Sequence, residues 1–318
     1  MKPTGDPAIA VVVATRNRAE RLARALDAIA AQRIQGGFEL VVVDDASGDA
    51  TARLLEQRRS RGEPGAFRVI RRDAPGGPAG ARNVGWRAAT APLVAFTDDD
   101  CEPAPGWLAA VAESAATAAH SFVYGPTHPH PEEAAGRGPF SRTIDVRTPG
   151  PWFPACNVAY PRALLERLDG FDERLPRGED TDLAWRAKEL GARPVWAPDA
   201  LVHHAVMEIG AVGRLEVAAG WHPAFVNFAR HPQLREQLAF GLFWKRSHAL
   251  LALAAVGVAL AGRLPPALLL AVPYARDVRA RMAAERAALS LAPYYLLHDA
   301  VETATAASGS LRHRTLVL

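Results

Sequence analysis

The sequence predicts an α/β fold with a mostly parallel central sheet, followed by a helical C-terminal region. Three observations predict it. Short apolar runs alternate with amphipathic stretches across residues 9–96, two of these runs end in consecutive aspartates, and the last third contains uncharged apolar stretches of helical length. Parallel sheets of this kind bind ligands at the carboxyl ends of their strands, so we expect the aspartates at a ligand-binding edge.

The composition is that of a globular protein with one large domain or two. Of the 318 residues, 49% are hydrophobic and 22% are charged, which is ample material for a core. The formal net charge of +3 is too small to indicate nucleic-acid binding. The two cysteines have no zinc-site spacing and form no disulfide framework, so we expect a reducing, cytoplasmic location. The opening residues 1–17 lack the apolar region of a signal peptide and predict a first strand instead.

Strands and helices alternate in the first half of the chain. Strands are predicted at residues 9–14, 38–43, 67–70 and 93–96, and helices at residues 19–32, 50–59 and 76–89. The first helix has apolar residues at the spacing of one helix face, namely Leu22, Ala25, Leu26 and Ile29. The last of these helices opens with a Gly-rich turn.

Three aspartates follow the strand predicted at residues 93–96. Asp98, Asp99 and Asp100 lie where that strand leaves the sheet, and like charges packed so closely repel each other. A hard divalent cation, Mg²⁺ or Mn²⁺, offsets this repulsion because it coordinates carboxylate oxygens. The alternative is a solvated acidic turn that caps a helix starting near Pro105.

A series of motifs resembles glycosyltransferase family 2. In chain order they are VVVATRNR, VVVDDASGDAT, GARNVGWRAA, FTDDDCEP, DGFDERL and GEDTDLAWR. Each motif is weak alone, but their order and spacing over roughly residues 8–205 are specific. The resemblance implies a GT-A fold, which is a nucleotide-binding α/β sandwich, in residues 1–215, with a separate helical region in residues 216–318. It also implies an inverting transferase that moves a sugar from a nucleoside diphosphate donor to a hydroxyl acceptor.

The resemblance places the donor nucleotide on the acid pair after the second strand. Asp45 would contact the uracil or thymine edge with Asp44 beside it, because a carboxylate accepts from a base N–H and a ribose hydroxyl. The alternative is a pair that caps the helix beginning at Ala50. Arg82 and Asn83 would favour phosphate, although ordinary polarity at a helix start explains both. The implied donor set is Thr15, Arg16, Asn17, Arg18, Asp44, Asp45, Arg82, Asn83, Asp98 and Asp99.

The acid triplet aligns with the DxD metal element of the family. Asp98 and Asp100 would hold Mn²⁺ or Mg²⁺, with Asp99 at the variable place, and the ion would stabilise charge on the leaving diphosphate. The family pattern adds a downstream histidine ligand, and the alignment favours His203 over His204. Neighbouring residues on a strand face opposite ways, so we expect only one of them to point at the metal. A packed or solvent-facing histidine is the alternative.

The resemblance makes Asp180 the general base. It would remove the proton from the acceptor hydroxyl as that oxygen attacks the anomeric carbon, and a single displacement inverts the configuration. No second carboxylic acid is required, because a metal-bound nucleoside diphosphate is a good leaving group. Glu179 and Asp182 would support the base or contact the acceptor, although acidic residues also stabilise the first turn of a helix without catalysis. Trp152 and Phe153 could stack on a sugar ring or pack in the core.

Two apolar runs lie in the last third of the chain. Residues 247–262 and 267–275 contain no Asp, Glu, Lys or Arg, and Arg263 and paired prolines separate them. Each run is shorter than the about 20 residues that a membrane span requires. One prediction is a pair of short helices that dips into the cytoplasmic leaflet and is held by basic flanks, and the other is a buried soluble pair.

The sequence therefore predicts a metal-dependent glycosyltransferase with a UDP- or dTDP-sugar donor and a glycan or lipid-linked acceptor in cell-envelope synthesis. We expect it in the cytoplasm, at the inner face of the cell membrane. A catalytically silent nucleotide-sugar-binding or membrane scaffold protein is one alternative, but the intact Asp98, Asp100 and Asp180 argue against it. A sugar nucleotidylyltransferase is another, but it needs a Gly-rich loop with Arg and Lys after the first strand, where ATRNRAE stands.

Overall fold

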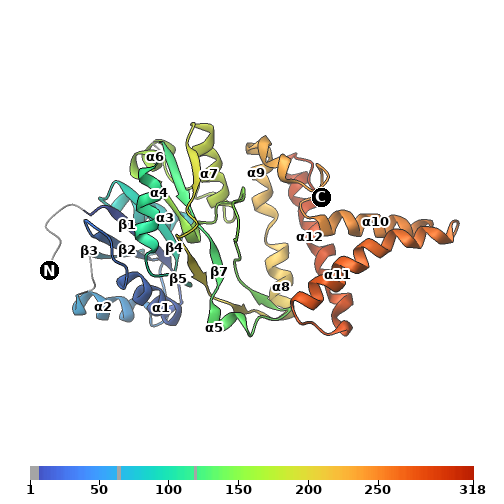
Figure 1. The fold of residues 1–318 in the computed structure, drawn as a ribbon, viewed down its shortest axis with the longest axis horizontal. Coiled ribbons are helices and arrows are strands. Elements are labelled where there is room, and N and C mark those ends of the chain that lie inside the picture. The colour runs from blue at the N-terminus through green and yellow to red at the C-terminus, as the bar shows by residue number, and fades with distance from the viewer. Residues whose placement is uncertain (1–6, 63–65, 118–119) are drawn as a thin grey trace. The chain divides into compact units, whose positions relative to one another are not determined.

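A computed structural model describes the chain at residues 7–62, 66–117 and 120–318 (Figure 1). The chain forms two compact units. The first comprises Met1–Glu133 and Thr143–Ala205, and the second comprises Ala134–Arg142 and Val206–Leu318. The domain boundary predicted after residue 215 falls within helix α8 (Gly210–Ala219) of the second unit.

A seven-stranded sheet with the order β10-β6-β9-β4-β1-β2-β3 is the centre of the first unit. Every neighbouring pair is parallel except the pairs that β9 makes with β4 and β6. The predicted α/β fold with a mostly parallel sheet is therefore confirmed. The strands are β1 (Ile9–Thr15), β2 (Phe38–Asp44), β3 (Ala66–Arg71), β4 (Leu93–Asp98), β6 (Ser121–Tyr124), β9 (Val158–Pro161) and β10 (Arg193–Trp196).

Helices pack on both faces of this sheet because its central strands are apolar on both sides. Ile9, Val11 and Val13 of β1 join one buried cluster with residues of α1, α2 and α4. Val12 faces the other way, toward α3, where a Cβ on Gly85 would lie 2.4 Å from Val12 Cγ1. The helices of this unit are α1 (Ala19–Ala30), α2 (Thr51–Arg61), α3 (Gly77–Ala88), α4 (Trp107–Ala116), α5 (Pro131–Ala134), α6 (Arg162–Leu168) and α7 (Glu179–Glu189), with the 3-10 turn η1 (Ala155–Asn157).

The carboxyl ends of β1, β2 and β4 meet at one edge of the sheet. In the parallel register Thr15 lies opposite Asp44, and Ala14 lies opposite Asp98. A second sheet, with the order β5-β11-β7, begins directly after the acid triplet. Its strands are β5 (Cys101–Pro103), β7 (Thr127–Pro129) and β11 (Val202–His204). This second sheet brings both candidate histidines to the acidic edge.

The second unit is helical, with a short two-stranded ribbon. Helices α10 and α11 are the two arms of a hairpin that η4 closes (Figure 1). At the base of the hairpin Tyr274, Val278, Met282 and Tyr295 pack together. The elements are α8 (Gly210–Ala219), α9 (Val226–Arg230), α10 (Arg246–Leu260), α11 (Val272–Ala284), α12 (Ala292–His313), the turns η2 (His222–Phe225), η3 (Pro232–Gln237), η4 (Pro265–Ala271) and η5 (Leu289–Leu291), and strands β8 (Ser141–Arg142) and β12 (Met207–Glu208). Among the described residues, no helix is both long enough and apolar enough to cross a bilayer.

Candidate functional site

Each aspartate of the acid triplet has a basic partner. Arg82 Nη2 donates to Asp98 Oδ1 at 2.7 Å, and Arg18 Nη1 donates to Asp99 Oδ1 at 3.0 Å and to Asp100 Oδ2 at 2.7 Å. Asp99 and Asp100 are buried, whereas the side chain of Asp98 is 25% exposed. Helix α4 has a glycine at its N-cap and no side-chain cap, so the alternative of a solvated capping turn is wrong.

Burial and the charge of Asp100 both act on Asp99. Thr15 Oγ1 donates to Asp99 Oδ2 at 2.8 Å. Burial raises the pKa of Asp99 to about 6 against the lowering effect of Arg18, and the charge on Asp100 adds to the rise. A further cation at this edge would relieve that repulsion.

His204, and not His203, faces the acid triplet. His204 Nε2 lies 3.6 Å from Asp100 Oδ1, and its Nδ1 lies 2.7 Å from the backbone oxygen of Ala205. A carbonyl only accepts, so Nδ1 carries the proton of the neutral ring and Nε2 keeps a lone pair for a metal. His203 lies on the other side of β11, with its ring 5.8 Å from that of His130, and burial lowers its pKa. The choice of His203 is therefore corrected to His204, because the strand register turns His204 toward Asp100.

The carboxylates at this edge offer oxygens of the kind that a hard divalent cation takes. Arg82 takes one oxygen of Asp98 and Arg18 takes one oxygen of Asp100, which leaves Asp98 Oδ2 and Asp100 Oδ1 as potential ligands. His204 Nε2 lies beside Asp100, and the ligand atoms of these two residues lie within 4.8 Å of each other, whereas Asp98 groups with the two cysteines. Carboxylate oxygens suit Mn²⁺ or Mg²⁺, and an ion shared by Asp98, Asp100 and His204 stays a prediction.

Asp180 lies in the first turn of α7 and is oriented by two backbone groups. Its Oδ1 accepts from Thr181 N at 2.7 Å, and its Oδ2 accepts from Ala155 N at 3.2 Å. Burial raises the pKa of Asp180 to about 7, and the charge on Glu179 raises it further, against the effect of Arg82. A carboxylate with a pKa near the working pH is well matched to general base catalysis.

Arg82 connects the acid triplet to the first turn of α7. The buried guanidinium donates to Asp98 Oδ1 at 2.7 Å and to Glu179 Oε1 at 2.8 Å. Glu179, the neighbour of Asp180 in the sequence, is thus held by Arg82, and its supporting role stays a prediction. The contact of Arg82 with phosphate stays a prediction.

Two residues of the predicted set are used elsewhere in the fold. Asn83 is buried, its nitrogen donates to Phe171 O, and its oxygen accepts from Phe171 N and Trp86 Nε1, all at 2.9 Å. Asp182 is fully buried and pairs with Arg186 at 2.7 Å. These side chains fasten α3 and α7. We therefore correct the assignment of Asn83 to the donor and of Asp182 to acceptor contact, whereas a supporting role of Asp182 stays a prediction.

The acid pair after β2 fixes two turns. Asp45 Oδ1 accepts from Gly76 N and Asp45 Oδ2 accepts from Gly77 N, both at 2.9 Å. Asp44 Oδ1 accepts from Ser47 N, also at 2.9 Å. Asp45 therefore holds the start of α3, whereas the sequence-based alternative was a cap on α2. The contact of this pair with a nucleoside stays a prediction.

The turn after β1 is tied to the turn after β2. Asn17 has a left-handed backbone (φ 55°), its N–H donates to Ser47 Oγ at 3.0 Å, and its side-chain oxygen accepts from Gly48 N at 2.7 Å. Thr15 is buried and Arg16 is exposed. Within residues 15–18, hydrogen bonds to the turn after β2 therefore fix Asn17, whereas the side chain of Arg16 is open to solvent.

The two predicted aromatic residues separate into a surface and a core position. Trp152 is 41% exposed, and its backbone oxygen accepts from Thr181 Oγ1 at 2.8 Å, so it is held beside the residue that follows Asp180. Phe153 is buried, with its ring 4.8 Å from that of Tyr124, as the core alternative predicted.

Tyr160 of β9 is a candidate site residue that the sequence analysis did not identify. It is buried, and its hydroxyl has no hydrogen-bond partner among the described residues. Burial raises the pKa of Tyr160, and the negative charge of Asp180 adds to the rise. Only the pairing of β9 with β4 and β6 brings this hydroxyl into the field of Asp180, so the sequence holds no signal for it.

Comparison with known proteins gives a consistent result. The family described as Glycosyl transferase family 2 matches residues 10–170. The chain is 31% identical over 226 residues to the pre-mycofactocin glycosyltransferase of Mycobacterium tuberculosis (64% of this chain, 44% of the relative). It is 30% identical over 244 residues to the validoxylamine A glucosyltransferase of Streptomyces hygroscopicus subsp. jinggangensis (63% and 57%). The chain spans about half the length of these curated relatives.

Solved structures give matches that cover nearly the whole chain. The mannosyltransferase PcManGT from Pyrobaculum calidifontis, in complex with GDP-Man and Mn²⁺, has a TM-score of 0.70 and 27% identity, and the match covers 95% of this chain and 88% of that one. Residues 1–349 of S. aureus TarS, in complex with UDP-GlcNAc, have a TM-score of 0.52 and 20% identity, over 99% and 93% of the two chains. The second match bears on the fold alone.

Proposed function

The chain belongs to glycosyltransferase family 2, and on that premise we propose that it transfers a sugar from a nucleoside diphosphate to a hydroxyl acceptor with inversion. The predicted family and GT-A fold are confirmed by the family match and by PcManGT. One observation carries the finer proposal: Arg82 joins Asp98 of the acid triplet to Glu179, which lies next to Asp180. The proposed ion site and the proposed base are thereby held in one buried network.

The donor lies at the carboxyl edge of the sheet in this proposal. Residues 15–18 and the turns that Asp44 and Asp45 fix would line the nucleoside pocket. A UDP- or dTDP-sugar is the proposed donor, and the bound nucleotides of the solved neighbours include both GDP-Man and UDP-GlcNAc. Asp98, Asp100 and His204 would hold Mn²⁺ or Mg²⁺, which would supply positive charge to the leaving diphosphate.

Asp180 acts as the general base in the proposed reaction. The acceptor oxygen forms a bond to the anomeric carbon, the bond from that carbon to the diphosphate breaks, and the hydroxyl proton moves to the carboxylate of Asp180. The N–H groups of Ala155 and Thr181 fix the orientation of that carboxylate. The exposed ring of Trp152 offers a surface for an acceptor sugar.

A donor panel tests the proposed function. UDP-, dTDP- and GDP-sugars are added to the protein with and without Mn²⁺, and the thermal unfolding midpoint is measured. We expect a Mn²⁺-dependent rise with a uridine or thymidine donor, followed by a product whose anomeric configuration is opposite to that of the donor. A response to a GDP-sugar alone would overturn the donor assignment, and a product with retained configuration would overturn the mechanism.

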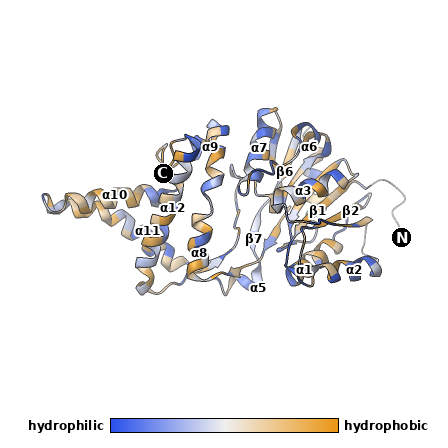
Figure 2. Cartoon of the chain, turned by 180° about the vertical axis from the view of Figure 1, so that it is seen from behind, coloured by the Kyte–Doolittle hydropathy of each residue, from blue (hydrophilic) through white to orange (hydrophobic). Residues whose placement is uncertain are grey.

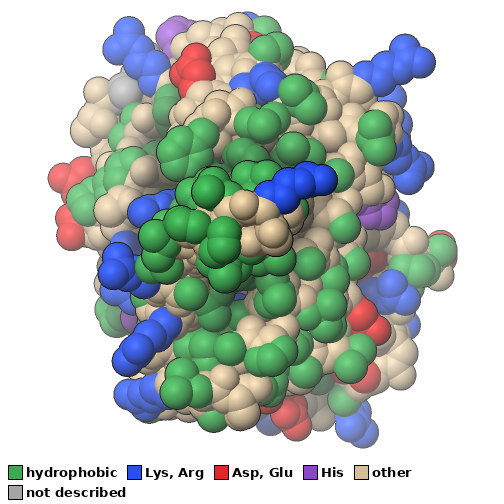
Figure 3. Space-filling model, turned by 90° about the vertical axis from the view of Figure 1, so that its right-hand side faces the viewer, with side chains coloured by type: hydrophobic (Ala, Val, Ile, Leu, Met, Phe, Trp, Pro, Cys, Tyr) green, Lys and Arg blue, Asp and Glu red, His purple; other side chains and the backbone are tan. Residues whose placement is uncertain are grey.

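The hairpin of α10, η4 and α11 supports the proposal of a peripheral membrane contact through residues 247–275. Eight of its large hydrophobic residues are 37% to 69% exposed, which conflicts with the alternative of a buried soluble pair. Helix α10 is mainly hydrophobic and α11 is mixed (Figure 2), and hydrophobic side chains gather over the end of the hairpin, with Lys and Arg around them (Figure 3). The exposed set is Leu253, Val256, Val258, Leu260, Leu264, Leu268, Leu269 and Val272.

The charges of this region suit an anionic lipid surface. Arg263 is the one residue with a formal charge between residues 247 and 275. Lys245, Arg246, Arg276 and Arg279 flank the apolar runs and are exposed. Two of the basic residues beside the runs have acidic partners: Lys245 pairs with Glu302 at 2.5 Å, and Arg281 pairs with Asp299 at 2.5 Å and Asp277 at 2.9 Å. We propose that the hairpin lies in the cytoplasmic leaflet at the inner face of the membrane, where a lipid-linked acceptor in envelope glycan synthesis would be presented.

Vesicle binding tests the hairpin. The full chain should sediment with anionic vesicles and be released only in part by high salt, because screening weakens the basic contacts but not apolar burial. Leu269→Glu should reduce sedimentation, and Leu311→Glu, at an 83% exposed position of α12, should not. A full-length chain that ignores the vesicles would overturn the membrane contact.

A further inference from the structure

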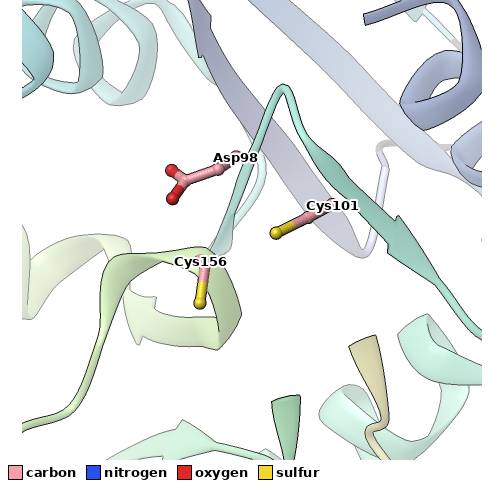
Figure 4. A group of neighbouring side chains, drawn as sticks. All are labelled: Asp98, Cys101 and Cys156. Atoms are coloured by element: carbon pink, nitrogen blue, oxygen red, sulfur yellow. The ribbon is translucent and has the colours of Figure 1, made fainter. Parts of the chain in front are cut away.

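Both cysteines of the chain meet beside the acid triplet. Cys101 begins β5 and Cys156 lies in η1, and both are free and buried. Their two sulfurs and a carboxylate oxygen of Asp98 lie within 4.8 Å of one another. Figure 4 shows these three side chains, which come from three different elements. The cysteines have no zinc-site spacing in the sequence, but the fold creates a ligand cluster from them.

A second ligand set shares one of these sulfurs. Asp100 Oδ1, Cys101 Sγ and His204 Nε2 also lie within 4.8 Å of one another. Cys101 Sγ is 3.9 Å from Asp100 Oδ1. The two thiols thus lie next to the carboxylates and the imidazole that would hold the hard cation.

The backbone around both thiols is firmly held. Asn157, next to Cys156, accepts from Trp107 Nε1 at 2.9 Å and donates to Pro126 O and Ala200 O at 2.8 Å and 2.7 Å. Cys101 pairs with His204 in the antiparallel register of β5 and β11. An ion would find these ligands already in place, and the 25% exposure of Asp98 gives it a way in.

Thiolate ligands select a different class of ion from the carboxylates alone. Soft sulfur ligands favour Zn²⁺ over Mg²⁺ and Mn²⁺, and Zn²⁺ accepts four ligands of the S, N and O types present here. We propose that the chain binds a thiophilic divalent cation, Zn²⁺ or Cd²⁺, through Cys101, Cys156 and Asp98, and that this ion excludes Mn²⁺ or Mg²⁺ from the donor site. On binding, each S–H bond is replaced by a sulfur–metal bond, and two protons leave to the solvent.

The consequence is that a thiophilic ion inhibits the enzyme. Arg82 holds one oxygen of Asp98, so a thiophilic ion that takes the other oxygen competes with the hard cation for this ligand. Charge repulsion also opposes a second dication beside the first. The exclusion of Mn²⁺ rests on the proposed function, whereas the thiol site does not.

Cadmium binding to the full chain tests the site without nucleotide or acceptor. Because the chain has only two cysteines, an ultraviolet sulfur-to-cadmium charge-transfer band reports on Cys101 and Cys156 alone. We expect a saturable band at one ion per chain, with affinity lowered by at least roughly 10–100-fold in Cys101→Ser, Cys156→Ser and Asp98→Asn. Glu102→Gln is the matched control, because Glu102 lies on the other face of β5 and pairs with Arg24. It should bind Cd²⁺ as the wild type does.

Two results would overturn the site. One is a native protein that gives no band although both thiols react after unfolding, and the other is a single-cysteine variant that binds Cd²⁺ as tightly as the wild type. Cadmium NMR of the wild type reports sulfur ligation directly, so a variant that fails to fold does not decide the outcome. Mn²⁺ binding, followed by electron paramagnetic resonance, should fall as Cd²⁺ is added. Simultaneous binding of both ions would overturn the exclusion and leave the thiol site standing.

Discussion

The two acidic clusters at the edge of the sheet have similar sequence contexts and different surroundings. Asp44 and Asp45 end β2, and Asp98 to Asp100 end β4, on the other side of β1. The first pair accepts from backbone N–H groups of two turns and also from Arg71 and Arg72, so both oxygens of each carboxylate have donors. In the second cluster, arginine side chains take one oxygen each of Asp98 and Asp100 and leave the other. The donors around a carboxylate, and not its place after a strand, decide whether it fastens a loop or is available to an ion.

Asp180 is a third carboxylate to compare, because it also accepts from backbone N–H groups. Burial raises its pKa to about 7. Asp180→Asn keeps the shape and cannot take a proton, so turnover should fall by roughly 10²–10⁴-fold with donor affinity nearly unchanged. Steady-state kinetics and donor titration check this. Asp182→Asn, at a buried structural position, should lower stability more than turnover. If Asp180→Asn loses donor affinity and keeps turnover at saturation, Asp180 is a binding residue.

The two histidines of β11 test which side chains hold an ion together with Asp98 and Asp100. His204→Ala should weaken Mn²⁺ binding by at least roughly 10–100-fold, because a nitrogen beside Asp100 is lost. His203→Ala should leave Mn²⁺ affinity unchanged, because His203 lies on the other side of β11. Calorimetric Mn²⁺ titration of both variants distinguishes them, and the reverse result would restore the sequence-based choice.

Local pattern predicted most of the fold and the positions of the acidic clusters. Apolar runs such as residues 9–14 were correctly predicted as strands because they are short and rich in β-branched residues, as strands buried on both faces are. Two of the differences depend on long-range pairing. His204 rather than His203 faces Asp100 because β11 pairs with β5 in one register. Asn83 was predicted as a site residue, but its partner Phe171 is 88 residues away in the sequence. The pair of Asp182 with Arg186, by contrast, has the local i,i+4 spacing of one helix face, so the sequence does contain that signal.

Substitution within the pair of Asp44 and Asp45 should have a different effect. Asp45→Ala removes the acceptor of the Gly76 and Gly77 N–H groups and the partner of Arg72, at a cost of about 1 kcal/mol for each lost hydrogen bond. Donor affinity should fall with or without Mn²⁺, while turnover at saturation survives. Urea unfolding and donor titration measure the two effects. An Asp45→Ala protein as stable as the wild type would contradict this account, because it would show that Asp45 does not stabilise the start of α3.

The smallest expected effect is a pH dependence of stability. Because the folded pKa of Asp180 is about 7 and the ordinary value is about 3.9, ionisation costs the folded state stability as the pH rises between these values. Asp180→Asn lacks this loss. Its unfolding midpoint relative to the wild type should therefore increase from about pH 4 to about pH 7 and then level off. A difference that stays constant over this range would show that burial does not raise this pKa.

Mn²⁺-dependent binding of a nucleoside diphosphate tests most directly the claim that the ion binds at the acid triplet, Asp98 to Asp100. Asp100→Asn should abolish the Mn²⁺ dependence with the fold intact, because one charged ligand is lost while Arg18 still has an acceptor. Asp45→Ala should bind more weakly and keep the Mn²⁺ dependence. Unchanged metal-dependent affinity in Asp100→Asn would contradict the assignment of the ion to Asp98, Asp100 and His204.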